Sequence, residues 1–215
     1  MKKIGFSFLL LLAITFVSVN LESCKKGDGD PFFSLYTRKA RVTGNWKVSK
    51  LTSTYKYNNK TYETTYDGYK KKVVYTVKDT TINGEVTNYI TEQTYSGETV
   101  TDYKKDGTYY YNETFLNDST GTSITIEVNG DWYFMGGNSS NGYKDKELLA
   151  MQVTDYIYNP LIGNDYSTIY QGSNTLSVLE IYELKNKEII LKVNKTETIN
   201  FTKYTTAMEY TLIPR

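Results

Sequence analysis

Two residue types that carry much of enzyme chemistry are almost missing from this sequence. Among its 215 residues there is no histidine, and Cys24 is the only cysteine. The commonest general base and zinc ligand is therefore absent, and the commonest thiol nucleophile is reduced to one copy. Ser-His-Asp catalysis is excluded, no intramolecular disulfide can form, and we expect neither a metal site nor a cofactor.

The sequence also lacks an excess of charge of either sign. It has 25 Lys and Arg against 24 Asp and Glu, which gives a net charge of +1. The lysines are spread along the chain rather than gathered in a patch, so we expect no nucleic-acid partner. Most carboxylates lie in turns and on polar faces beside lysines, which is typical of solvated surface charge. A glycosidase acting through a carboxylate pair is the remaining enzymatic alternative; we predict a binding protein that is not an enzyme.

The N-terminal segment is an export signal. Lys2 and Lys3 precede a nearly uninterrupted apolar run from Ile4 to Val19. This run is short for a membrane-spanning helix, which needs about 20 apolar residues. We therefore predict a signal peptide over residues 1–23, with an uncleaved membrane anchor as the alternative.

Residues 24–40 are predicted to join the signal peptide to the folded domain. They begin with Cys24 and a charged, glycine-containing stretch that is typical of a flexible spacer. Phe32 to Tyr36 then form a short helix or turn that caps one end of the domain. The rest of the chain, 41–215, is predicted to be a single domain.

This domain has the composition of a β-sheet protein. It is rich in tyrosine, with 22 in the whole chain, and proline is scarce, with 3. Runs with alternating large and polar residues are separated by turn-forming pairs at Asn58-Asn59, Asp67-Gly68, Asn83-Gly84 and Asp106-Gly107. No stretch predicts a helix long enough for a parallel crossover. The fold class is therefore all-β, an antiparallel meander of about eight strands that closes into a barrel, with some polar hairpins extending beyond the core as a ribbon.

The domain opens with a Gly-x-Trp strand. Trp46 and Val48 fall on one face, whereas Leu51 continues the alternation one residue out of phase. This predicts a β-bulge near Ser49-Lys50. Gly44 allows another segment to pass close to the indole, so Trp46 is predicted to plug one end of the barrel; an ordinary core tryptophan is the alternative.

The dipeptide Asn129-Gly130 also predicts a hairpin. Ile124, Ile126 and Val128 precede Asn129-Gly130, and Trp132 and Phe134 follow. A three-residue loop ending at Gly130 would pair Ile126 with Trp132 and keep one apolar face.

Four pieces of the chain together resemble the lipocalin-like domains of bacterial lipoproteins. They are the lipobox-like Leu21-Glu22-Ser23-Cys24, the opening Gly44-x-Trp46-Lys47-Val48, the turn and strand Lys105 to Tyr109, and the hairpin Ile181 to Ile189. The resemblance implies a lipocalin-like barrel whose mature N-terminus is an acylated Cys24. It also implies a lipid-anchored protein of the cell envelope, at the outer membrane, on its periplasmic or surface-exposed face.

A ligand, if one binds, is expected to enter the barrel at the end opposite Trp46. The loop Tyr156 to Asn174 and the turn from Gly136 to Tyr143 would form the rims of that mouth. The predicted ligand-binding residues are aromatic, and they are Trp132, Phe134, Tyr156, Tyr158 and Tyr166. The ligand would be small and either apolar or aromatic, and the protein would be a monomer.

Two other interpretations of the aromatic residues stay open. The barrel interior is filled by its own side chains in one of them, and the tyrosine-rich hairpins bind a glycan or a protein. In the other, the tyrosines only satisfy β-propensity and cross-strand pairing.

Two short segments resemble a bacterial O-glycosylation sequon. In Asp118-Ser119-Thr120 and Asp79-Thr80-Thr81 an Asp precedes a hydroxyl residue and a Thr follows it. Ser119 and Thr80 are therefore candidate glycosylation sites, in predicted turns where a glycan is sterically tolerated.

The lipid anchor gives the first prediction. Cys24 follows an apolar run and a small residue, and so Cys24→Ala should release the protein from the membrane. Metabolic labelling with an alkyne fatty acid tests this, because label should appear on the wild-type chain and not on Cys24→Ala. Label on the variant, or residues 1–23 retained in the native protein, would contradict the prediction.

Overall fold

The computed structural model describes residues 37–80, 86–136, 146–161, 168–171, 176–199 and 201–215. The predicted signal peptide, Cys24 and the capping segment Phe32 to Tyr36 lie outside the described residues. Within the described part, no helix has the length and apolar character to span a membrane.

The described chain begins with a short helix, α2 (Arg38–Val42), which precedes the strands. The strands are β1 (Gly44–Tyr57), β2 (Lys60–Tyr66), β3 (Lys70–Thr80), β4 (Val86–Tyr103), β5 (Thr108–Asn117), β6 (Ser123–Gly136), β7 (Glu147–Leu161), β8 (Thr168–Gln171), β9 (Leu176–Lys185), β10 (Glu188–Ile199) and β11 (Thr202–Pro214).

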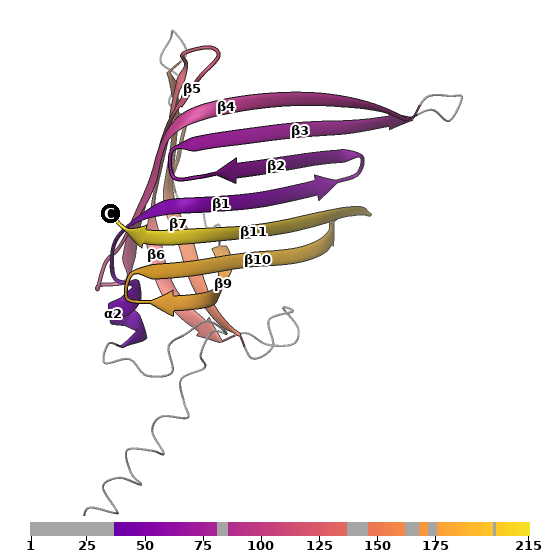
Figure 1. Cartoon of the computed structure of the whole chain (residues 1–215). Helices are drawn as coiled ribbons and strands as arrows, with labels where there is room; N and C mark the ends of the chain where they lie inside the picture. The colour runs from indigo at the N-terminus through magenta and orange to yellow at the C-terminus, as the bar shows by residue number, and fades with distance from the viewer. Residues whose placement is uncertain (1–36, 81–85, 137–145, 162–167, 172–175, 200) are drawn as a thin grey trace, which may run out of the picture.

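The strands form one antiparallel sheet that closes on itself (Figure 1). Strands that are consecutive in sequence are neighbours in the sheet, with one exception at β8. β8 pairs only with the second half of β7, and the first half of β7 pairs with β9. Pairing of β6 with β7, and of β1 with β11, completes the circle. The prediction of an all-β antiparallel barrel is confirmed. Its circle contains ten strands rather than about eight.

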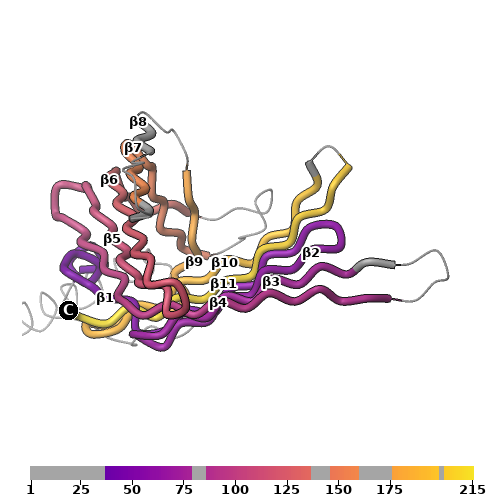
Figure 2. The backbone as a smooth tube through the Cα atoms, turned by 90° about the horizontal axis from the view of Figure 1, so that it is seen from above, coloured from indigo at the N-terminus to yellow at the C-terminus, as the bar shows by residue number. Residues whose placement is uncertain are grey.

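The extra strands arise because β1 and β4 fork. Gly44 to Lys47 of β1 pair directly with β4, at Val100 to Tyr103. From Leu51 onward β1 pairs with β2 instead, and the β2–β3 hairpin fills the gap between β1 and β4. The circle therefore has eight strands near α2 and ten farther away. The outer halves of β1–β4, β10 and β11 continue beyond the barrel (Figure 2), and we call this part the extension. The extension corresponds to the ribbon that was predicted from the polar hairpins.

Local chemistry explains several of these elements. The pairing of β1 with β11 shifts between Val48 and Lys50, which confirms the predicted bulge. This shift returns Leu51 to the inner face on which Trp46 and Val48 lie. The β1–β2 turn places Asn58 at φ 51, and the β2–β3 and β4–β5 turns place Gly68 at φ 96 and Gly107 at φ 98. These left-handed conformations suit Asn and Gly. The fourth predicted turn, Asn83-Gly84, lies outside the described residues.

The hairpin predicted at Asn129-Gly130 is wrong, because β6 runs unbroken through both residues. Even-numbered residues from Ile124 to Phe134 simply continue on one inner face, so a single strand satisfies the apolar pattern. Gly130 serves a close approach rather than a turn. A Cβ there would lie 2.1 Å from the Gln152 carbonyl oxygen and 2.6 Å from the Tyr109 ring.

The predicted loop from Tyr156 to Asn174 also contains more structure than expected. β7 extends through it to Leu161, and β8 pairs with β7 so that Tyr156 faces Tyr170. The alternation of Leu149, Met151 and Val153 resumes one residue out of phase at Tyr156, because the pairing of β6 with β7 shifts register at this point. The aromatic residues that follow favour strands, which explains the longer β7.

The close approach at Gly130 gives a second prediction. Gly130→Ala should lower the free energy of unfolding by at least about 1–3 kcal/mol, because a methyl group there meets backbone that cannot move aside. Gly136→Ala is the matched control, since a Cβ at this position on the same strand meets nothing within 4 Å. Urea denaturation measures both. Equal stability of the two variants would contradict the packing described here.

Candidate functional site

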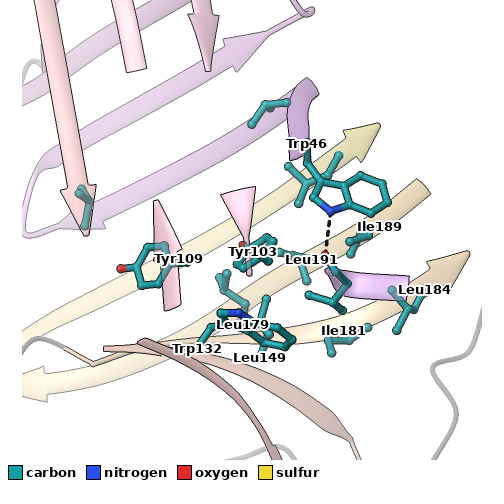
Figure 3. Close-up of a cluster of buried hydrophobic side chains, with 14 of the residues drawn as sticks. Trp46, Tyr103, Tyr109, Trp132, Leu149, Leu179, Ile181, Leu184, Ile189 and Leu191 are labelled. Atoms are coloured by element: carbon teal, nitrogen blue, oxygen red, sulfur yellow. Dashed lines mark hydrogen bonds between the residues drawn. The ribbon is translucent and has the colours of Figure 1, made fainter. Parts of the chain in front are cut away.

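One end of the barrel is closed by α2 and Trp46 (Figure 3). Trp46 is 3% exposed, and its indole Nε1 donates a hydrogen bond to the Val42 carbonyl at 2.8 Å. Gly44 adopts φ 147, a conformation that favours glycine, beside the indole. Val42, Leu184 and Ile189 are fully buried around this group. Trp46 therefore lies at the barrel end, with its ring against the chain that precedes Gly44.

Trp132 and Phe134 lie at this same end and not at the opposite mouth. The Trp132 Nε1 donates to the Lys104 carbonyl at 3.0 Å, in the β4–β5 turn, and its ring meets Tyr103 and Phe134 edge to face. The misplacement follows from the wrong hairpin: a turn at Asn129-Gly130 would have returned Trp132 alongside Ile126, whereas the unbroken β6 carries it onward to the closed end. Neither residue lines the main cavity.

The barrel interior above this floor is hollow. A cavity of about 1030 Å³ extends from Val48 and Leu212, near the closed end, to Val193 and Met208, near the extension. Its walls are mainly apolar and aromatic, with side chains from β1, β4, β5, β6, β7, β9, β10 and β11. The volume is at the upper end of the range for small-molecule sites.

The cavity reaches the solvent beside the start of β9. β9 begins at Leu176, whereas its partner β10 continues outward to Ile199. Leu176 is 47% exposed, and it lines the cavity together with Lys195 and Thr196, which are also exposed. The opening is therefore at the β9–β10 side, away from α2.

The three tyrosines predicted at the mouth have different positions. Tyr156 lines the cavity. Tyr158 lies two residues farther along β7, opposite Ile126, and is not part of the lining. Tyr166 lies outside the described residues. The predicted rim 136–143 begins at Gly136, which pairs with Glu147 at the closed end, and the remainder of that turn also lies outside the described residues.

The interior tyrosines are neutral. Burial raises the pKa of the Tyr103, Tyr111 and Tyr210 phenols above the usual 10.0, and it raises the pKa of Tyr109 to about 12. Tyr103 also donates its hydroxyl to the Met151 sulfur at 3.4 Å. These phenols therefore offer a ligand neutral hydrogen-bonding groups within an apolar surface.

Sequence reasoning missed a charged pair inside the barrel. Lys71 on β3 and Glu113 on β5 form an ion pair beside a second cavity of about 180 Å³. Alternation could have found them, because Lys71 shares the face of Val73 and Tyr75, and Glu113 shares the face of Tyr111 and Phe115. We expected charged residues to be solvated, and for this reason the alternation that places Lys71 and Glu113 on inner faces was overlooked.

A tyrosine cluster lies on the extension, on the face that continues the barrel interior. Tyr55, Tyr62 and Tyr75 are directly opposite one another on β1, β2 and β3, and Tyr57 faces Tyr204 on β11. The Tyr62 and Tyr75 rings are stacked with centroids 4.5 Å apart, and those of Tyr57 and Tyr204 with centroids 5.9 Å apart. We call these five residues the tyrosine cluster.

The two candidate glycosylation sites differ in what the structure shows of them. Ser119 is exposed in the β5–β6 turn, where its backbone N–H donates to the Asn117 side chain. Thr80 ends β3, and its side chain lies outside the described part.

Comparison of the chain with models of known protein families, with curated proteins and with solved structures returned no match.

The buried phenols give a third prediction. An unfolded tyrosine loses its proton near pH 10.0, whereas Tyr103, Tyr109 and Tyr111 hold theirs to higher pH in the folded barrel. Above pH 10 the unfolded chain therefore binds fewer protons, so the free energy of unfolding should fall as pH rises. Urea denaturation at increasing pH measures this fall. Tyr103→Phe should make the fall in the free energy of unfolding shallower, and Tyr69→Phe, at an exposed position, should not. Identical slopes in all three proteins would contradict the prediction.

Proposed function

We propose that this chain is a lipid-anchored, lipocalin-like binding protein of the bacterial cell envelope that holds a small apolar or aromatic ligand in its barrel. One observation carries the proposal, namely the open cavity of about 1030 Å³ in the barrel interior. Protein interiors normally pack as densely as organic crystals, with few voids larger than a water molecule. A void of this size within a closed sheet is therefore the strongest available sign of a binding site.

The lining indicates the chemistry of the ligand. Val193, Leu191 and Leu179 present apolar surface, whose burial against a ligand is the main driving force for binding. Tyr109 and Tyr156 add aromatic surface with hydroxyl groups that can orient the ligand. Binding of this kind needs no catalytic group, and we propose no enzymatic activity, cofactor or nucleic-acid partner.

The position of α2 agrees with a lipid anchor at Cys24. α2 is the first described element, and it lies at the closed end of the barrel, away from the opening. An acylated Cys24 would hold the protein at the outer membrane as a monomer.

The tyrosine cluster supports a second candidate function. Its five rings lie half-buried on the extension, outside the barrel. A glycan or a protein partner could bind this aromatic surface, as tyrosine is well suited to contact surfaces that are partly wet. The protein would then be a surface interaction module, and the barrel would serve as its scaffold.

Titration with the neutral fluorescent probe N-phenyl-1-naphthylamine tests the cavity. We expect saturable binding, and we expect Val193→Trp to weaken it at least about ten-fold by filling the site, as steric exclusion removes several buried contacts. Ala207→Trp is the matched control, since Ala207 lies on the outer face of β11 beside the partner of Val193. Absence of binding to the wild-type protein would overturn the ligand-binding proposal.

Gel electrophoresis in the presence of soluble polysaccharides separates the two functions. Retardation that Tyr57→Ala and Tyr204→Ala abolish would favour the interaction module, particularly if the probe does not bind. Tyr110→Ala, on the outer face of the barrel on β5, is the control for loss of an unrelated tyrosine. Unchanged migration of the wild-type protein would count against glycan binding.

A further inference from the structure

The ion pair of Lys71 and Glu113 lies at the fork in the barrel wall. Lys71 is on β3 and Glu113 on β5, and the two strands flank β4, where Lys71 is opposite Tyr95 and Glu113 is opposite Thr99. The side chains of Lys71 and Glu113 are only 23% and 12% exposed. Both line the smaller cavity of about 180 Å³, so the pair is placed in the interior and not on the surface.

The hydrogen bonds of this pair are distributed unevenly. Both oxygens of the Glu113 carboxylate are engaged, one by Lys71 and the other by the Tyr111 hydroxyl, which donates at 2.8 Å. A lysine ammonium carries three N–H donors. Among the described residues, the one hydrogen-bond acceptor for the Lys71 ammonium is Glu113, and its nitrogen also lies 4.7 Å from the centre of the Phe115 ring. The pair therefore has donors to spare and few acceptors.

The burial of such a pair is energetically costly. Removing both charges from water costs several kcal/mol for each ion, and replacement by apolar residues is often neutral or stabilising. Burial also lowers the pKa of the Lys71 ammonium to about 8, because desolvation disfavours the charged form. A group that accepts hydrogen bonds from the remaining N–H donors of Lys71 would satisfy the ammonium.

The smaller cavity adjoins the main one. Val48, Tyr111, Met208 and Tyr210 line both cavities. An elongated molecule with its apolar body in the main cavity can therefore bring one end to Lys71 past these shared residues.

We propose that Lys71 and Glu113 form a polar subsite that binds the carbonyl group of a neutral amphipathic ligand, an ester or an amide, whose hydrocarbon part occupies the main cavity. This inference rests on the proposed ligand-binding function and specifies its ligand. The remaining N–H donors of Lys71 can donate to a hydrogen-bond acceptor on the ligand. The head group is neutral because Lys71 and Glu113 already balance each other's charge, and a carboxylate would be buried beside Glu113 as an uncompensated charge.

Displacement of N-phenyl-1-naphthylamine at neutral pH by three ligands of similar size tests the subsite. The ligands are methyl decanoate, decanoate and undecane. We expect the wild-type protein to bind the ester about ten-fold more tightly than the alkane, as one hydrogen bond to a charged donor would give. The ester should also bind more tightly than the carboxylate.

The critical variant is Lys71→Met with Glu113→Leu. Both charges are removed together, because loss of Lys71 alone would leave Glu113 as a buried unpaired charge and endanger folding. This double variant should still bind the probe but should lose the preference for the ester over the alkane. Lys72→Met is the matched control, since Lys72 is exposed and pairs with Glu92, and it should keep the preference.

The possible failures are distinguishable. If the probe does not bind the wild-type protein, the proposed function itself fails. If the probe binds but the ester and the alkane displace it equally, or the double variant keeps the preference, only the subsite is overturned. Tighter binding of decanoate than of the ester would overturn the neutral head group.

Discussion

Near α2, β1 pairs directly with β4, and a few residues farther along the two strands separate to admit β2 and β3. The width of a barrel grows with its number of strands, so this fork makes one end narrow and the other wide. Trp46 and Trp132 fill the narrow end. The wide end retains a cavity, and the added strands continue outward as the extension.

The chain adapts to the fork through its backbone. Gly97 marks the place where β4 turns from β5 toward β3, because a Cβ there would lie 2.0 Å from the Thr114 carbonyl oxygen. The Gly97 N–H donates to the Tyr69 carbonyl at 2.9 Å and ties β4 to the β2–β3 turn. The bulge after Val48 performs the matching adjustment in β1. These two irregularities let one continuous inner face run from the floor to the extension.

That inner face changes its chemistry along its length. It begins with the packed tryptophans and leucines of the floor, continues as an apolar cavity with neutral phenols, and then meets the Lys71–Glu113 pair. It ends in the tyrosine cluster beyond the barrel. A molecule bound there would meet apolar, polar and aromatic surface in that order, which suits an amphipathic ligand better than a wholly apolar one.

The period-2 pattern and the turn residues by themselves determined the all-β antiparallel class, the bulge at Ser49-Lys50, most hairpins and the inner position of Trp46. These features are local, since alternation and positive φ are encoded within a few residues. The pattern around Gly130 did not distinguish a turn from a close contact with Gln152, so the sequence assigned Trp132 to the wrong end. Only the tertiary structure decided the fork, the hollow interior and the meeting of Lys71 with Glu113. All three depend on which distant strands become neighbours, and alternation specifies the face of a strand but not its partner.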